Sequence, residues 1–191
     1  MEPLRFPEDK ISARAKAFKI IKEKSFSLGD YVLASGKRSK YYLDMKPAML
    51  SPEGSTALAE LILERIGDLD VHYIGGLEMG AVPLIAPVSM LSYQRQKPIA
   101  GFFVRKHVKD HGTMKLIETA GDLRGENVVI LEDVTTSGES AMLAVKAVKA
   151  VGANVVLVLS IVDREEGAAK LYAKADIPFD RLFATSDFMA A

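Results

Sequence analysis

The strongest constraint on the fold is a regular alternation of strand-like and helix-like segments that begins near Val71. Short apolar runs rich in β-branched residues alternate with longer stretches of helical periodicity. A helix between two strands is typical of a βαβ crossover, which makes the strands parallel and places helices on both faces of the sheet. The expected strands are Val71–Gly75, Ile99–Val104, Lys115–Glu118, Asn127–Leu131, Val155–Val162 and Arg181–Ala184, and the expected helices are Val82–Tyr93, Ser140–Val151 and Glu166–Lys174. We therefore predict an α/β fold with a central parallel sheet flanked by helices.

Two helices and a hairpin are expected before this alternation begins. Apolar residues at helical spacing predict an amphipathic helix near the N-terminus: Ile11, Ala15, Phe18 and Ile21. The β-prone pieces Tyr31–Leu33 and Tyr41–Asp44 are joined by a polar, glycine-containing connection suited to a hairpin. A second helix should begin after Ser51, which precedes a proline, and end at Gly67.

Length and composition indicate one ordinary globular domain. The 191 residues suit a single domain, in which about 1–50 form the N-terminal helix and hairpin and about 51–191 form the α/β core. The 25 basic residues balance the 25 acidic ones, so any anion must bind at a local cluster, and we expect neither nucleic acid nor membrane as a partner. The absence of cysteine excludes disulfides, cysteine-ligated metals and thiol catalysis, and it favours the cytoplasm.

The most specific pattern is Val128–Ser140, in which an apolar strand leads to two acids and then to a turn of hydroxyls and glycine that opens a helix. Glu132 and Asp133 can accept hydrogen bonds from a sugar diol, and we expect both in a solvent-facing loop. The N–H groups of the helix start, with the Thr and Ser hydroxyls, can bind a phosphate. The alternative is a helix N-cap beside two solvated acids. The chain lacks a P-loop lysine and a G-x-G-x-x-G motif, which disfavours nucleoside triphosphates and dinucleotides.

This stretch resembles the phosphoribosyl pyrophosphate (PRPP) signature of type I phosphoribosyltransferases. The resemblance implies that Asp133 is catalytic and that Thr136 also touches the base. It implies PRPP contacts from Glu132, Asp133, Val134, Thr135, Thr136, Ser137, Gly138, Glu139 and Ser140.

A second polar loop, Arg105–Thr113, follows the strand Ile99–Val104 and holds three cations and two of the three histidines. A departing pyrophosphate needs such a cluster for its developing charge, whereas the alternative is an ordinary solvated loop. The pattern R-K-x-x-K-D-H-G resembles the mobile catalytic loop of orotate phosphoribosyltransferases. The resemblance implies that the loop closes over the neighbouring subunit's site in a homodimer, that Lys109 and His111 are catalytic, and that PRPP is contacted by Arg105, Lys106, Lys109 and His111.

Two further segments resemble the same family. The glycine-rich Gly75–Pro83 is similar to its pyrophosphate loop, although some members have a lysine where this chain has Gly80, so that the anion contact must rest on main-chain amides. The hairpin Leu33–Asp44 resembles the family's N-terminal hood, which implies that Tyr42 lies over the base. Many relatives have a lysine where this chain has Ala34, and Lys37 is the candidate to replace it. A tight turn and a bare hairpin are the respective alternatives.

Arg164 follows the apolar run Val155–Val162 in a D-R-x-E pattern. A guanidinium can hold a carboxylate through two parallel hydrogen bonds, and orotate differs from uracil by its carboxylate. In the family an arginine of this pattern contacts the base, which implies that Arg164 binds orotate. The alternative is a surface ion pair with Asp163 or Glu166.

These motifs follow the family's order from about Tyr31 to Glu165, and the chain is identified as a member of the orotate phosphoribosyltransferases. The resemblance implies transfer of phosphoribosyl from PRPP to orotate in pyrimidine biosynthesis, with Mg²⁺ carried on PRPP and no protein nucleophile. Two alternatives remain. A purine phosphoribosyltransferase shares the Glu132–Ser140 pattern, and a non-catalytic regulator that binds RNA or DNA can use the same fold.

Overall fold

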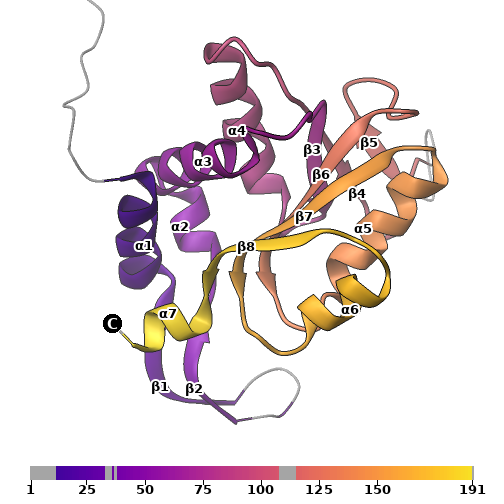
Figure 1. Cartoon of the computed structure of the whole chain (residues 1–191). Helices are drawn as coiled ribbons and strands as arrows, with labels where there is room; N and C mark the ends of the chain where they lie inside the picture. Colours follow the sequence, from indigo (N-terminus) through magenta and orange to yellow (C-terminus); the bar gives the residue numbers. More distant parts are fainter. Residues whose placement is uncertain (1–11, 33–35, 37, 108–114, 191) are drawn as a thin grey trace, which may run out of the picture.

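The computed structural model describes residues 12–32, 36, 38–107 and 115–190. Its centre is a six-stranded sheet in the order β5-β4-β3-β6-β7-β8 (Figure 1). Its strands are β3 (Tyr73–Leu77), β4 (Ala100–Val104), β5 (Ile117–Thr119), β6 (Asn127–Thr135), β7 (Asn154–Asp163) and β8 (Phe179–Ala184). All neighbouring strands are parallel except β4 and β5. The predicted α/β fold is therefore confirmed, with a mostly parallel sheet.

The edge strand β5 departs from the parallel arrangement, because it pairs with β4 antiparallel and places Glu118 opposite Phe103. A parallel pair needs a crossover, usually a helix, to return the chain to the same end of the sheet. The stretch between β4 and β5 has a polar sequence without helical periodicity. The chain therefore reverses its direction after β4. The reversal brings Glu118 of β5 beside Arg105, the first residue after β4.

Helices cover both faces of the sheet. They are α3 (Pro52–Ile66) and α4 (Val82–Gln94), and then α5 (Glu139–Ala150) and α6 (Ala168–Lys174). One hydrophobic cluster joins α3 and α4 to Val129 and Leu131 of β6, and a second joins α5 and α6 to Val128 and Ile130. β6 is thus buried on both faces, which explains its continuous apolar sequence.

Several predicted helix ends are confirmed by their hydrogen bonds. α3 begins after Ser51, whose Oγ accepts the N–H of Gly54 at 3.1 Å, and it ends before Gly67. The helices expected at Val82–Tyr93 and Ser140–Val151 begin and end within one residue of α4 and α5. In the described part of the chain, no helix is both long enough and apolar enough to cross a membrane.

The N-terminal part lies against the last strand (Figure 1). It contains α1 (Ala13–Lys24), the antiparallel pair β1 (Phe26–Val32) and β2 (Arg38–Leu43), and the short α2 (Lys46–Leu50). Phe188, in the short C-terminal helix α7 (Thr185–Met189), stacks on Phe18 at 4.7 Å and on Phe26 at 5.5 Å between ring centroids. The predicted first helix and hairpin are confirmed, but both strands are longer than expected. α2 and α7 have five residues each, too few to give a periodic signal.

Candidate active site

The two acids of the Val128–Ser140 pattern lie inside β6 and not in the solvent-facing loop that the sequence led us to expect. The ladder with β7 continues past Leu131 and pairs Glu132 with Ser160 and Thr135 with Asp163. The reason is the length of β7, which supplies backbone partners as far as Asp163. Glu132 is only 8% exposed and Asp133 is half-buried, so the picture of two solvated acids is wrong.

Glu132 is a buried acid with an oxygen free for a ligand. Its Oε2 has no hydrogen-bond partner among the described residues. Burial, and to a smaller extent the negative charge of Asp133, raise the pKa of Glu132 from 4.5 to about 8, although the charge of Lys106 opposes the shift. A buried carboxyl group without a partner is costly in the absence of a ligand. Such a group is a common feature of functional sites.

Asp133 faces a different set of neighbours, since adjacent residues of a strand point to opposite faces. Its Oδ1 accepts the N–H of Val134 at 2.9 Å. Burial raises its pKa, although its backbone hydrogen bonds and the charge of Lys46 oppose this. A Cβ at Gly80 would lie 2.5 Å from Oδ1 of Asp133. The glycine thus allows the loop after β3 to approach Asp133 closely. A lysine at position 80 would push the loop and the Asp133 side chain apart.

The turn after β6 packs tightly at the start of α5 and leaves the first N–H groups of the helix accessible to a ligand. Gly138, the N-cap of α5, has φ 87°, and its carbonyl accepts a hydrogen bond from Tyr172 Oη at 3.0 Å. A Cβ there would meet the Tyr172 ring at 2.9 Å. No side chain among the described residues caps α5, so its first N–H groups are available to an anion. Thr135 is buried and Thr136 is partly exposed, whereas Ser137, Glu139 and Ser140 are exposed.

Arg105 is held by acids. Its Nε and Nη2 donate to Oε1 of Glu118 at 3.1 and 2.9 Å, and its Nη1 lies 3.8 Å from Oε2 of Glu78. The N–H of Lys106 donates to the other oxygen of Glu78 at 3.0 Å. The sequence predicted an open cluster of cations in this loop, but the two acids partly neutralise its first residue, Arg105. Lys109 and His111 lie outside the described residues.

Arg164 meets Tyr41 and not Tyr42. Its Nε donates to Tyr41 Oη at 2.9 Å and lies 2.9 Å from Oε1 of Glu166, so the ion pair considered as the alternative is present. Tyr42 is 47% exposed and packs on Tyr31 with ring centroids 5.5 Å apart. Neighbouring residues of β2 face opposite sides, which separates the two tyrosines. Ala34 and Lys37 lie outside the described residues.

Three charged residues near the site were missed by the sequence reasoning: Asp44, Lys46 and Glu78. Nζ of Lys46 donates to Oδ1 of Asp44 at 2.9 Å. This hydrogen bond raises the pKa of Lys46, and the charge of Asp133 raises it further. The available signal was the D-x-K spacing directly after β2. Glu78 follows β3, and its glycine-rich surroundings drew attention away from its charge.

Sequence and structure comparisons agree with this arrangement. The orotate phosphoribosyltransferase of Bradyrhizobium diazoefficiens is 50% identical over 185 residues, covering 95% of this chain and 99% of the relative. The enzyme of the same name from Sorangium cellulosum is 38% identical, with 93% and 94% covered. The crystal structure of Mycobacterium tuberculosis orotate phosphoribosyltransferase in complex with PRPP has a TM-score of 0.78 at 31% identity, with 92% and 98% covered. No family model matches the chain.

The sheet order, the acids of β6 and the glycine turn before α5 define a type I phosphoribosyltransferase fold. Adenine phosphoribosyltransferase from Saccharomyces cerevisiae shares this fold with a TM-score of 0.66, at 21% identity. The bacterial relatives have a higher identity and nearly complete coverage, and they therefore identify the family as well as the fold. The chain belongs to the orotate phosphoribosyltransferase family.

Proposed function

We propose that this chain transfers the phosphoribosyl group of PRPP to orotate, giving orotidine 5′-monophosphate and pyrophosphate, as a pentosyltransferase of pyrimidine (UMP) biosynthesis. The main supporting observation is the junction of β6 and α5, where a buried acid and a half-buried acid are followed by a short turn and by a helix start whose N-cap, Gly138, has no side-chain cap. A sugar with hydroxyls at one end and a phosphate at the other matches that order of groups. Membership of the family supports orotate as the acceptor over a purine.

The site acts by positioning and electrostatics. Glu132 and Asp133 accept hydrogen bonds from the ribose hydroxyls, and the turn from Val134 to Ser140 with the α5 N–H groups binds the 5-phosphate. Charge then develops on the departing pyrophosphate, which Lys106, Lys109 and His111 stabilise. Arg105 joins them by exchanging its contacts with Glu78 and Glu118 for the pyrophosphate. No covalent intermediate with the protein is required.

Arg164 binds the orotate carboxylate, and the base lies close to Thr136. The guanidinium of Arg164 pairs with the carboxylate of Glu166, and orotate would take the place of that carboxylate. Tyr41 holds the arginine in place through Nε. Tyr42 is available for stacking only if the hairpin moves, because its ring packs on Tyr31 and faces away from the Arg164 side.

Mg²⁺ enters as part of the PRPP complex. Carboxylate and phosphate oxygens are the ligands that Mg²⁺ prefers, and it usually takes one or two of them from the protein. The residues present fit this requirement, since Glu132 has an oxygen without a hydrogen-bond partner among the described residues and Asp133 is the next carboxylate along β6. The ion would neutralise phosphate charge. No group of three acids or histidines in the described ranges forms a site for it by itself.

We further propose a homodimer in which the Arg105–Thr113 loop serves the neighbouring site, in the cytoplasm. Exposed apolar side chains support a protein contact: Met79 directly follows β3 beside the active-site loops, and Met90 and Tyr93 lie one helical turn apart at the far end of α4. The absence of cysteine supports the compartment.

The direct test is the absorbance change of orotate when the protein is mixed with PRPP and Mg²⁺. Orotate should disappear in proportion to the pyrophosphate formed, and adenine or hypoxanthine should neither react nor compete. Turnover of a purine with no turnover of orotate would replace this proposal with a purine enzyme. Binding of PRPP without turnover of any base would favour a regulator.

A further inference from the structure

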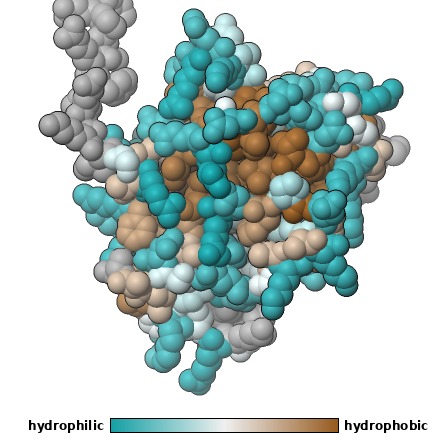
Figure 2. All heavy atoms as spheres, in the orientation of Figure 1, coloured by the Kyte–Doolittle hydropathy of each residue, from teal (hydrophilic) through white to brown (hydrophobic). Residues whose placement is uncertain are grey.

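A cavity of about 500 Å³ lies at the opposite end of the sheet from the proposed active site. It is formed where α3 and α4 end and where the segments before β3 and β4 begin. Its lining is mixed: apolar side chains such as Leu63, Ile66, Val71 and Ile99 form one part, and polar or charged residues form the rest. Figure 2 shows hydrophobic residues gathered in the upper middle of the view, between hydrophilic margins. A volume of this size is typical of pockets for small organic molecules.

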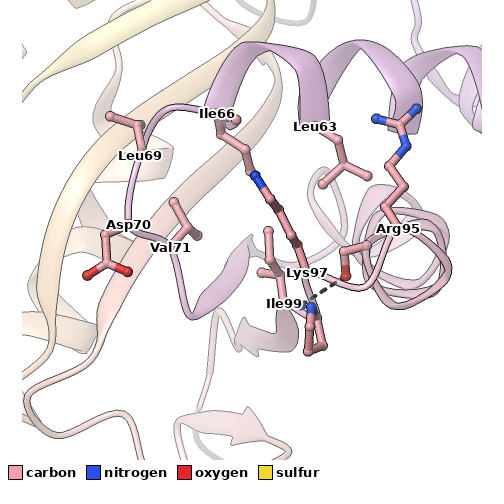
Figure 3. Close-up of a pocket in the computed structure, with 11 residues that line it drawn as sticks. Leu63, Ile66, Leu69, Asp70, Val71, Arg95, Lys97 and Ile99 are labelled. Atoms are coloured by element: carbon pink, nitrogen blue, oxygen red, sulfur yellow. Dashed lines mark hydrogen bonds between the residues drawn. The ribbon is translucent and has the colours of Figure 1, made fainter.

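Two cations, Arg95 and Lys97, line this cavity. Arg95 and Lys97 are exposed, and neither forms an ion pair with a residue in the described part of the chain. Lys97 extends across the cavity toward Ile66, and Arg95 stands on the side of Leu63 (Figure 3). The wall contains one acid, Asp70, but both of its oxygens are engaged: Oδ1 lies 3.3 Å from His72 Nε2, and Oδ2 accepts from Asn127 Nδ2 at 3.0 Å.

The backbone holds these two cations in a fixed turn. Gln96, between them, has φ 59°, a conformation that favours glycine or asparagine. The N–H of Lys97 donates to Ser92 O at 3.1 Å, and the N–H of Ile99 donates to Ser92 Oγ at 2.9 Å. Ser92 is 1% exposed, so this connection is anchored inside the protein. Cations also suit the C-terminal end of a helix, but the helix end alone does not account for the apolar cavity between them.

We propose that this cavity is a second ligand site, separate from the transferase site, for a small organic anion with an apolar or aromatic body. The body would lie against Ile66, Val71 and Ile99, and the acidic group would pair with Arg95 and Lys97. Both parts of such a ligand would contribute favourable binding free energy. The apolar body would be removed from water, and the acidic group would pair with two cations that Asp70 does not neutralise. A neutral apolar ligand would use only the walls, and a small inorganic anion would use only the cations.

The test uses two fluorescent probes that differ in charge: 8-anilinonaphthalene-1-sulfonate, which is anionic, and N-phenyl-1-naphthylamine, which is neutral. Both are titrated into the full-length protein with saturating PRPP, which fills the transferase site. Replacing both cations (Arg95→Gln with Lys97→Gln) should weaken sulfonate binding at least tenfold and change binding of the neutral probe less than twofold. Leu69→Ser, which alters a wall residue that is 42% exposed, should weaken both probes.

A matched control removes two exposed lysines from helix ends elsewhere, Lys149→Gln with Lys174→Gln, and should leave both probes unaffected. Thermal unfolding midpoints show that each variant is folded, and sedimentation shows whether its oligomeric state has changed. Equal sulfonate binding by wild type and the Arg95/Lys97 variant would overturn the proposal and leave an ordinary pair of helix-end cations. Loss of all sulfonate binding in PRPP would also overturn it. A Leu69→Ser protein that changes from dimer to monomer would show that the cavity is covered by a second copy.

Discussion

Replacing Glu132 with glutamine should stabilise the unliganded protein at neutral pH and at the same time impair catalysis. Burial raises the pKa of Glu132 from 4.5 to about 8, so folding takes up a proton between these two values. The stability of the protein therefore falls as the pH rises from about 4.5 toward 8, and it levels off above that. At 1.36 kcal/mol for each pH unit, the loss reaches about 3 kcal/mol at pH 7.

Glutamine does not titrate, and it has nearly the shape of the protonated acid. Urea unfolding of Glu132→Gln, compared with wild type from pH 5 to 8.5 at one protein concentration, should therefore show a stability gain that grows with pH. Glu64→Gln, at an exposed position of α3, is the matched control and should follow wild type. Superimposable stability curves for wild type and Glu132→Gln would refute the buried, uncompensated acid. Turnover should fall in the variant, because the amide lacks the charged oxygen proposed to hold the ribose.

Three further experiments test the other parts of the site. Arg164→Ala should lower kcat/KM for orotate about 10- to 150-fold, the equivalent of roughly 1.5–3 kcal/mol, with little change in KM for PRPP; an equal loss for PRPP would move Arg164 to the phosphate side. Gly80→Ala should raise KM for PRPP, because its Cβ would lie 2.5 Å from Asp133 Oδ1, and an unchanged KM would mean that this contact does not position the acid. Mixing Lys109→Ala with Asp133→Asn subunits should restore activity through heterodimers with one complete site; heterodimers that form without activity would place the loop in its own chain's site.

The alternation of segments could be predicted from the sequence because it depends on local periodicity. The cap of α3 at Ser51 and the apolar stripes of the helices are encoded within a few residues of one another. The end of β6 could not be found in this way. Glu132 and Asp133 are polar and look like loop residues, but the partner strand β7 extends far enough to pair with them. Their burial is therefore a property of the pairing and not of the segment.

The same reason explains the differences at the cations. The sequence shows that Arg105 follows a strand, but only the antiparallel return of β5 brings Glu118 against it. Likewise, the sequence shows two adjacent tyrosines, Tyr41 and Tyr42, but the register of β2 decides which of them faces Arg164. Residue types at the ends of strands could thus be predicted, whereas the partners that neutralise or orient them come from other segments.

The parallel sheet explains why residues so distant in sequence can act together. β3, β4, β6 and β7 end at the same edge, so Gly80, Arg105, Asp133 and Arg164 each follow or complete one of four adjacent strands. The charged groups at this edge are paired with one another or neutralised by protonation: Arg105 pairs with Glu118, Arg164 pairs with Glu166, and the raised pKa of Glu132 favours its neutral form. PRPP, with its phosphates and hydroxyls, and orotate, with its carboxylate, can together replace each of these internal contacts. Binding is therefore expected to release a proton near pH 7, since the ribose site requires Glu132 in its charged form.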